Sequence, residues 1–361
     1  ILLGMSVFLC GAELLILSPA GLRNPQMVQK FWKICERYGV TVAGGVPTSI
    51  GAIANVPLDG ADLSSIRACL TGSASLPGAV REAFEEISGT PLKEIYGMTE
   101  ASGLIACNPF EGEDGAGSVG LRLPYTDVTV RRLRADGSPG DPCDPDEVGV
   151  ITIAGPTVSP GYRDSKHDGA TFDRGMLNSG DLGYMDAQGR LFITGRSKDL
   201  IIRSGHNIDP LMIENAVQRH PAVAVAAAVG LPDAYAGELP ICYVQLKDGA
   251  AATEDELRAF ACSAIDERPA WPKVIRIVDT IPMTAVGKIF KPTLREDAAR
   301  LKVLSILAEH DLTGDVEATT GSLRRIEVKV TLSGAGDDDV ARVEEALGAF
   351  LFEAECRLGP S

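Results

Sequence analysis

Two short stretches hold side chains suited to binding a nucleotide. "TGSASLP" (71–77) is a run of small residues after an apolar strand, where a flat ring can approach the backbone closely. "YGMTE" (96–100) offers an aromatic ring, a hydroxyl and a carboxylate within five residues. If a nucleotide is present, those groups suit stacking on a base, contact with a phosphate and binding of Mg²⁺.

Three further stretches place charged side chains in turns. "SGDLGYMD" (179–186) puts Asp181 in a tight turn, where its carboxylate can accept bonds from two ribose hydroxyls. "GRSKDLIIRSGHNIDP" (195–210) contains Arg196 and Lys198, and "PMTAVGKIF" (282–290) has the single cation Lys288 behind a glycine. Taken alone, each stretch is as typical of an ordinary turn, a cap or a solvated lysine as of a site.

The elements expected to position these stretches begin as alternating helices and strands. A helix is predicted over 24–39, because Asn24 can cap it and Pro25 suits its first turn. Its expected inner face is Val28, Phe31, Cys35 and Tyr38. Strand-to-loop steps follow in "VTVAGGVPT", "SIRACLTGSASLP" and "PLKEIYGMTEASG". This alternation predicts a mainly parallel sheet with its ligands at the carboxyl ends of the strands.

The pattern changes twice further along the chain. Short β runs broken by Gly, Pro and Asp, namely "DVTVRRL", "VGVITIAG" and "GRLFITG", indicate an antiparallel barrel-like unit over about 115–195. A compact α+β region follows, with helices near 210–219 and from Thr253, where Thr253 and Glu256 form a capping-box pattern. Its expected strands are "AVAVAAAVG", "ICYVQLK" and "VIRIVD". The tail is expected to hold one strand in "RRIEVKVTL" and one helix in "DDDVARVEEALGAF".

The predicted fold class is therefore α/β, in three parts. Residues 1–197 form part of a large parallel-sheet domain that includes the β-barrel-like subdomain at about 115–195. Residues 198–300 form a small α+β domain. Residues 301–361 form an α/β tail to which no role is assigned.

Composition excludes several classes of protein. A net charge of −15 argues against nucleic-acid binding and against docking on anionic lipid. The eight cysteines form no CxxC pair, which favours reduced thiols in the cytoplasm over a disulfide or zinc framework. The apolar stretch 1–17 is interrupted by Glu13, so a buried helix and strand are predicted there and no membrane span. Because Ile1 opens directly in core-like sequence, we interpret the chain as a fragment whose natural beginning is missing.

Several familiar motifs fail in this chain. Gly115, Gly117 and Gly120 spell GxGxxG but stand between a loop and a predicted strand, which is the wrong context for a dinucleotide fold. A Walker motif at Lys288 fails because Pro282 and Ile289 occupy required positions, and no GxSxG elbow supports a serine hydrolase. Two basic clusters are also expected to be solvated faces when each is considered alone: Arg196, Lys198 and Arg203, then Lys288, Lys291 and Arg295.

The five stretches quoted at the start of this section occur in a fixed order along the chain, and together they are far more specific than any one of them alone. In residues 1–300 the sequence resembles the adenylate-forming (AMP-binding) superfamily of acyl-CoA synthetases, adenylation domains and luciferases. The phrases "GHNIDP" and "TAVGKIFKP" are most similar to bacterial fatty-acyl-CoA ligases. The resemblance implies a nucleotide site in which Gly72, Ser73 and Ala74 line the adenine pocket, Tyr96 stacks on adenine, and Asp181 and Arg196 bind the ribose.

The resemblance also implies how the reaction is divided along the chain. Thr99 would contact phosphate, Glu100 would hold Mg²⁺ and Lys288 would be the catalytic lysine of adenylate formation. Lys198 would be the hinge of a small mobile domain, and Gly205 would approach the CoA arm. The "GGVPT" loop (44–48) would border the acyl pocket.

These roles imply an ATP-dependent carboxylate–CoA ligase that uses ATP, Mg²⁺ and coenzyme A and leaves AMP, with a fatty-type carboxylic acid as substrate. The alternatives are an adenylation domain serving a carrier protein, and a non-catalytic nucleotide- or acyl-binding module. The sequence does not decide whether the protein forms an oligomer. The family's phosphate loop is absent, so this fragment alone is expected to be poorly active. Smaller departures are Ser179, Val286 and the pair His206–Asn207.

Overall fold

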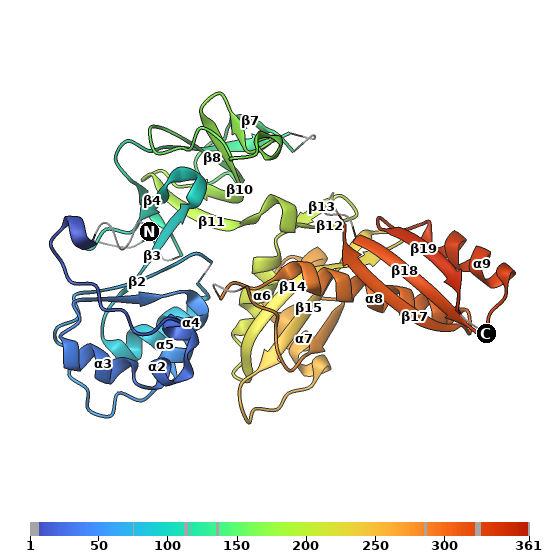
Figure 1. Ribbon diagram of the computed structural model, residues 1–361, viewed down its shortest axis with the longest axis horizontal. Helices are drawn as coiled ribbons and strands as arrows, with labels where there is room; N and C mark the ends of the chain where they lie inside the picture. Colours follow the sequence, from blue (N-terminus) through green and yellow to red (C-terminus); the bar gives the residue numbers. More distant parts are fainter. Residues whose placement is uncertain are drawn as a thin grey trace. The chain divides into compact units, whose positions relative to one another are not determined.

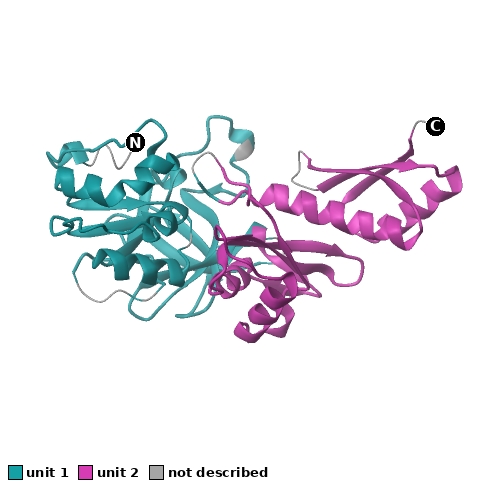
Figure 2. Cartoon of the chain, turned by 90° about the horizontal axis from the view of Figure 1, so that it is seen from below, with its two compact units in different colours: residues 1–198, 285–288 teal, residues 199–284, 289–361 magenta. Residues whose placement is uncertain are grey.

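The computed structural model describes residues 7–74, 76–111, 115, 117–134, 137–284, 287–321 and 326–359. The chain forms two compact units, which Figure 2 shows in different colours. Unit 1 comprises Ile1–Lys198 with Ala285–Lys288, and unit 2 comprises Asp199–Thr284 with Ile289–Ser361.

Unit 1 begins with helices packed on parallel strands (Figure 1). The helices are η1 Gly21–Arg23, α2 Pro25–Gln29, α3 Phe31–Tyr38, α4 Pro47–Ala54 and α5 Gly78–Ser88, and the strands are β1 Val42–Gly45, β2 Ala68–Gly72 and β3 Leu92–Met98. Trp32, Ile50, Ile53 and Phe84 fill the core between the two layers. The Trp32 indole N–H is also satisfied, because it donates to the Val56 carbonyl at 2.9 Å.

The helix predicted over 24–39 is two helices. Asn24 caps α2 as expected, by accepting from the Gln26 amide, but the chain leaves helical geometry at Lys30 before α3 starts. Val28, Phe31 and Cys35, which were expected on the inner face, are buried, and Trp32 is buried with them. Tyr38, the fourth residue expected there, is 58% exposed.

Two predictions for buried apolar segments are wrong. In the described part of 1–17, residues 12–17 form no strand, and Phe8, Leu9 and Ile16 are exposed. Val42, expected in a buried strand, is 52% exposed because side chains alternate along β1, and its neighbour Ala43 is the residue that faces the core. The expected glycine-rich loop 44–48 is shorter than predicted, since β1 ends at Gly45 and α4 begins at Pro47.

The parallel and antiparallel parts of unit 1 form one sheet. Among the described residues the strand order is β1-β2-β3-β4-β5-β11-β10-β8-β6-β7, with β9 paired to β10. The added elements are η2 Thr99–Ala101, β4 Gly103–Cys107, β5 Gly120–Arg122, β6 Asp127–Leu133, β7 Pro139–Pro142, β8 Gly149–Ala154, η3 Ser165–His167, β9 Phe172–Asp173, β10 Met176–Met185 and β11 Arg190–Arg196. Pairs from β3 onward are antiparallel. The predicted fold class is confirmed, and β6, β8 and β11 are the three predicted β runs.

Unit 2 has a second, mixed sheet in the order β13-β12-β15-β14, with β16 parallel to β15. Its elements are β12 Ile201–Arg203, β13 His206–Ile208, α6 Pro210–Gln218, β14 Val223–Asp233, β15 Gly237–Leu246, α7 Glu254–Ala264, η5 Arg268–Ala270 and β16 Val274–Ile277. The capping box predicted for α7 is confirmed. The Glu256 amide donates to Thr253 Oγ1, and the Thr253 amide donates to Glu256 Oε2.

The tail adds a three-stranded sheet in the order β17-β18-β19, and α8 and α9 pack on one of its faces (Figure 2). The elements are α8 Lys291–Glu309, β17 Thr313–Thr320, β18 Ile326–Ser333, α9 Asp337–Leu347 and β19 Glu353–Leu358. Helix α8 joins two cores, because Leu294 and Ala298 pack with β14 and β15 whereas Val303 and Leu307 pack with the last sheet. It runs unbroken through residue 300, where a domain boundary is predicted.

No helix among the described residues combines the length and the apolar character needed to cross a membrane.

Candidate functional site

Three of the predicted nucleotide residues form one hydrogen-bonded group in unit 1. The Tyr96 hydroxyl donates to Asp181 Oδ2 at 2.7 Å, and Arg196 Nε donates to Asp181 Oδ1 at 2.8 Å. Asp181 is 5% exposed, whereas the Arg196 side chain is 46% exposed. The group therefore consists of a buried carboxylate that is hydrogen-bonded to a partly exposed guanidinium and to the hydroxyl of a half-buried phenol ring.

The strand pairing explains why these side chains meet. Asp181 and Arg196 are cross-strand partners of β10 and β11, so their side chains leave the sheet on the same face. Asp181 lies inside β10 and not in the tight turn that the sequence predicted, and the strand is irregular here because its pairing with β8 shifts register between Asn178 and Leu182. Ser179 fixes this irregularity, since its hydroxyl donates to the Ile151 carbonyl and accepts from the Asp181 amide. Gly180 supplies the left-handed backbone that the irregularity requires, with φ of +69°.

The charges in this group favour binding over proton transfer. Burial, followed by the Asp181 charge, raises the pKa of Tyr96, so the phenol stays a neutral donor. Each Asp181 oxygen accepts one of the bonds described above, and a carboxylate has about four acceptor positions. Asp181 therefore keeps capacity for two more donors, such as a vicinal diol.

The small-residue loop starts where β2 ends, and its geometry requires glycine. A Cβ on Gly72 would lie 2.7 Å from both Ile95 Cγ1 and the Ile95 carbonyl oxygen. Ser73 follows with a left-handed φ of +75°, and Ser73 and Ala74 are exposed. Ser75 is outside the described residues. The chain thus leaves β2 with its backbone accessible and close to the strand that carries Tyr96.

Thr99 and Glu100 lie in η2, immediately after β3. Thr99 is exposed, and Glu100 Oε1 accepts a hydrogen bond from the Tyr162 hydroxyl at 2.7 Å. Tyr162 packs edge-to-face on Phe172 with ring centroids 5.1 Å apart. The sequence analysis missed Tyr162, because nothing in the spacing of "PGYRD" connects it to a carboxylate 62 residues earlier.

Lys288 lies in the four-residue segment that belongs to unit 1. Within that unit, the carbonyl of the preceding Gly287 accepts from Thr48 Oγ1 at 3.1 Å. Gly287 has φ of +79°, and a Cβ there would meet Val46 and Thr48 at 3.3 and 3.4 Å. Val286, noted above as a departure from the family pattern, is outside the described residues.

Lys198 and Gly205 lie on either side of the division between the units. Lys198 is in η4 Ser197–Asp199 and is the last residue of the first segment of unit 1. Gly205 is in the β12–β13 hairpin of unit 2, where Ser204 and Gly205 have φ of +48° and +82°. This combination is typical of a tight type I′ hairpin turn.

A basic cavity of about 240 Å³ opens beside that hairpin, within unit 2. It is lined by Arg203, Ser204, His206, Arg268 and Pro269. Arg203 is anchored through its bond to the Pro269 carbonyl at 2.6 Å, and the Arg268 guanidinium lies over the Trp271 ring at 5.7 Å. Two guanidinium groups beside an imidazole favour an anionic ligand.

The two basic clusters predicted from the sequence are not simple solvated faces. Lys291 pairs with Glu214 at 2.7 Å, and Arg295 pairs with Asp199 at 2.9 Å. Arg196 is held by Asp181, as described above. Arg196, Lys291 and Arg295 thus each pair with a particular carboxylate.

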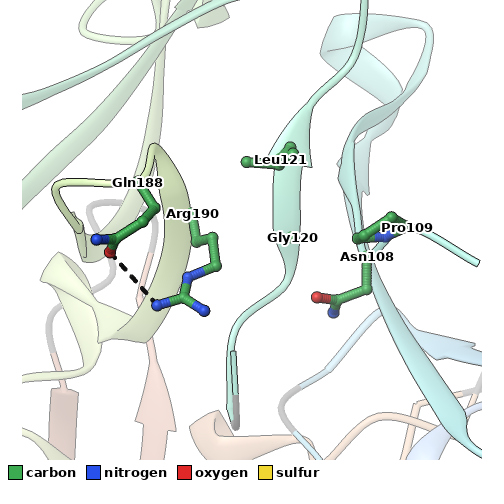
Figure 3. A pocket seen from close by; sticks show the side chains of 6 residues that line it. All are labelled: Asn108, Pro109, Gly120, Leu121, Gln188 and Arg190. Carbon is green, nitrogen blue, oxygen red and sulfur yellow. Dashed lines mark hydrogen bonds between the residues drawn. The ribbon is translucent and has the colours of Figure 1, made fainter. Parts of the chain in front are cut away.

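A second cavity, of about 220 Å³, lies in unit 1 at the far end of β11 from Arg196. Figure 3 shows its lining residues: Asn108, Pro109, Gly120, Leu121, Gln188 and Arg190. Asn108 is 3% exposed and donates through Nδ2 to the Ser118 carbonyl at 2.6 Å, while its Oδ1 has no partner. Arg190 begins β11 and Arg196 ends it, so this cavity is separate from the Tyr96–Asp181–Arg196 group.

Metal binding has a limited basis in unit 1. No group of three His, Cys, Asp or Glu side chains in the described part of the chain could hold a metal ion by itself. Glu100 offers one carboxylate, with Oε1 bonded to Tyr162. A single carboxylate fits Mg²⁺ that is held mainly by substrate phosphates, because this ion keeps waters and takes only one or two carboxylates.

The chain matches two protein-family models. Residues 2–163 match "AMP-binding enzyme", and residues 212–288 match "AMP-binding enzyme C-terminal domain". The segment between the two matches contains Asp181, Arg196, Lys198 and Gly205.

Individual relatives agree with the models. The chain is 38% identical over 363 residues to a marinolic acid–CoA ligase of Pseudoalteromonas sp. (strain SANK 73390), covering 99% of this chain and 55% of that protein. It is 39% identical over 267 residues to a long-chain-fatty-acid–CoA ligase of Bacillus subtilis (strain 168), covering 73% and 47%. The crystal structure of ATP-bound MatB from Rhodopseudomonas palustris is similar with a TM-score of 0.69 and 29% identity, covering 77% and 54%. The chain thus spans about half the length of the curated relatives it matches.

Proposed function

The chain belongs to the AMP-binding enzyme family, and on that premise we propose that it is part of an ATP-dependent carboxylate–CoA ligase. In the first half-reaction a carboxylate oxygen attacks the α-phosphorus of ATP and pyrophosphate leaves. In the second, the thiolate of CoA attacks the acyl carbon and AMP leaves. The observation that carries the proposal is the Tyr96–Asp181–Arg196 group beside the Gly72 loop.

The nucleoside half of ATP is assigned to that group. Asp181 accepts from the two ribose hydroxyls, Arg196 orients its carboxylate, and the Tyr96 ring stacks on adenine. The accessible backbone of Gly72, Ser73 and Ala74 forms the opposite wall. Support comes from the spare acceptor capacity of Asp181 and from the close approach of Gly72 to Ile95, the residue before Tyr96, which leaves no room for a Cβ.

The phosphates are assigned to the end of β3. The Thr99 hydroxyl, which is exposed, donates to a phosphate oxygen. Glu100, oriented by Tyr162, would hold Mg²⁺. When bound, this ion neutralises charge on the phosphates.

Lys288 is assigned to charge stabilisation during adenylate formation. The α-phosphate and the carboxylate accumulate negative charge as they join, and a positioned cation lowers that barrier. The left-handed turn at Gly287 and its bond from Thr48 support the assignment, because they hold the backbone ahead of Lys288 within unit 1.

The thioester step is assigned to the hairpin of unit 2. Gly205 lets the pantetheine arm pass close to the backbone, and the basic cavity beside it suits the phosphates of CoA. The division of the chain between Lys198 and Asp199 supports Lys198 as the hinge between the two steps. A fatty-type acid as substrate is part of the proposal and is supported by the similarity to the long-chain-fatty-acid–CoA ligase named above. A cytoplasmic location stays a prediction.

The test is a mass-spectrometric screen of carboxylic acids with ATP, Mg²⁺ and CoA. The screen is run on this chain alone and on the proposed longer protein, which would contain both this chain and the phosphate loop. We expect acyl-CoA and AMP from the longer protein, and pyrophosphate release near background from this chain alone. Acyl transfer to a carrier protein in place of CoA would favour the adenylation-domain alternative. Nucleotide binding without turnover of any acid by the longer protein would contradict the proposal.

A further inference from the structure

The segment that carries Lys288 leaves unit 2 and returns to it, and side chains of unit 2 hold both of its ends. Where β16 ends, the Val278 amide still donates to the Val244 carbonyl of β15 at 2.9 Å. Three residues later the Ile281 amide donates to the side-chain oxygen of Gln245 at 3.0 Å. Ile281 is fully buried. Gln245, the residue after Val244, therefore extends the attachment to β15 as far as Ile281.

The two ends of that segment are also joined to each other. Met283 and Ile289 form an antiparallel bridge, and the Phe290 amide donates to the Pro282 carbonyl at 2.8 Å. Ile289 packs against the core formed by β14, β15 and α8. The two ends thus make one closed base, and this base belongs to unit 2.

A buried ion pair fixes the end that follows Lys288. Lys291, the first residue of α8, pairs with Glu214 Oε1 of α6 at 2.7 Å, and their side chains are 17% and 11% exposed. The same Glu214 oxygen accepts from the Ala228 amide of β14 at 2.9 Å. Replacing such a pair with apolar residues often leaves stability unchanged or higher, so its value here lies in the arrangement that it fixes. It joins α6, β14 and the start of α8 at one point.

Fixed ends limit the positions that the Lys288 amine can take. A fully extended chain spans about 3.5 Å per residue, so the backbone from Lys288 to Lys291 reaches at most about 10 Å. A shift of either end is therefore passed on to Lys288. Stabilisation of charge in a transition state depends on the place of the cation, and a misplacement of about 1 Å is enough to slow a reaction strongly.

We propose that Gln245 and Glu214 are positioning residues for adenylate formation, which hold the two ends of the segment so that Lys288 is presented in one place. This inference rests on the proposed function for the role of Lys288, but the two attachments themselves do not. Gln245 acts through the oxygen that it offers to the Ile281 amide. Glutamate, which keeps such an oxygen, should therefore replace Gln245, whereas leucine should not.

The first measurement is hydrogen exchange at the Ile281 amide in this chain. Gln245→Leu should speed the exchange about tenfold, the scale of one lost hydrogen bond, and Gln245→Glu should stay within about threefold of wild type. The matched control is Gln218→Leu, because half-buried Gln218 also bonds to backbone in unit 2, through Nε2 to the Ala224 carbonyl at 2.7 Å. This control should leave Ile281 exchange within about threefold. Unchanged exchange in Gln245→Leu would overturn the attachment.

The second measurement follows the two half-reactions in the proposed longer protein. Gln245→Leu should slow pyrophosphate release about tenfold and leave thioester formation from supplied acyl-adenylate within about threefold. Glu214→Gln should do the same, because glutamine keeps an oxygen for the Ala228 amide but removes the charge that pairs with Lys291. Gln245→Glu and Gln218→Leu should stay within about threefold in both half-reactions. An equal loss of both half-reactions in Gln245→Leu would overturn the positioning role.

A background that lacks the lysine separates positioning from general weakening. In Lys288→Ala, Gln245→Leu should slow pyrophosphate release no further, because a residue that acts through Lys288 then has nothing left to position. A further tenfold loss in that background would show that Gln245 acts elsewhere and would overturn the role. If the longer protein releases no pyrophosphate with any acid, the proposed function fails and the positioning role fails with it. Exchange at Ile281 still decides, in that case, whether Gln245 holds the segment.

Discussion

The nucleotide group of unit 1 and the two glycine turns are built in opposite ways. Asp181 is buried and held by bonds of 2.7 and 2.8 Å to Tyr96 and Arg196. Gly205 and Gly287 lie in turns with φ of +82° and +79°, where the backbone takes a conformation that most residues avoid. One region fixes side chains through partners, and the other fixes backbone through the absence of a side chain.

The difference matches the demands of the two proposed tasks. A ribose site has to be the same in every step, and a buried network that satisfies its own members stays in one arrangement. A turn that serves a single step needs room for a chain to pass or for a cation to be withdrawn. Mutations in the network should therefore affect nucleotide affinity, and mutations in the turns should affect one half-reaction.

The largest expected effect is on the turn that carries Lys288. In the longer protein, Lys288→Ala should slow adenylate formation by about a hundredfold or more, the scale for one transition-state charge partner. Pyrophosphate release measures this step. Thioester formation from supplied acyl-adenylate should persist, and Lys247→Ala, which removes an exposed lysine, should change neither step. An equal loss in both half-reactions would show that the turn is not specific to one step.

The next effect concerns the network. Asp181→Asn removes the charge that two ribose hydroxyls would meet, so the KM for ATP should rise about ten- to hundredfold with a smaller change in kcat. The matched control is Asp186→Asn on the same hairpin. Asp186 pairs with Arg190 at 2.6 Å but has no ligand assigned. Equal changes in the KM for ATP would mean that Asp181 acts only through hairpin stability.

Sequence patterns were most informative where one element faces one core. The β6, β8 and β11 runs and the α7 capping box were predicted from local residues, because each has a regular burial pattern or a complete cap. The pattern failed for α8, whose apolar residues face two different cores in turn. It also failed for β17 and β19, edge strands with Val316 and Cys356 as their buried side chains.

The site was predicted residue by residue but not as a network. Asp181 and Arg196 were both expected to bind the ribose, whereas Tyr96 was expected only to stack its ring on adenine, with no role for its hydroxyl. Its bond to Asp181 joins residues 85 positions apart and depends on the order of strands in the large sheet.

A smaller effect is expected at the second turn. In Gly205→Ala the added Cβ would meet no atom within 4 Å, so the energetic cost of the substitution comes from the left-handed backbone alone. That cost is about 1–2 kcal/mol, enough to raise the KM for CoA about fivefold or more while leaving the KM for ATP unchanged. Gly249→Ala imposes the same kind of strain at φ of +75°, also meets no atom within 4 Å, and should not raise the KM for CoA. An equal rise in the KM for ATP would show that the Gly205 turn is not specific to the CoA step.

The smallest expected effect tests whether Glu100 belongs with the network or with the turns. Tyr162→Phe keeps the ring packed on Phe172 and removes only the hydroxyl that orients Glu100. Burial and the Glu100 charge raise the pKa of Tyr162, so it donates throughout the neutral range. Because the pair is partly open to solvent, we expect the Mg²⁺ concentration for half-maximal adenylation to rise only about threefold. Glu100→Gln should raise it further, and Tyr162→Phe should add little in that background. Additive effects in the double variant would show that Tyr162 acts elsewhere, and Glu100 would then be fixed by its backbone alone.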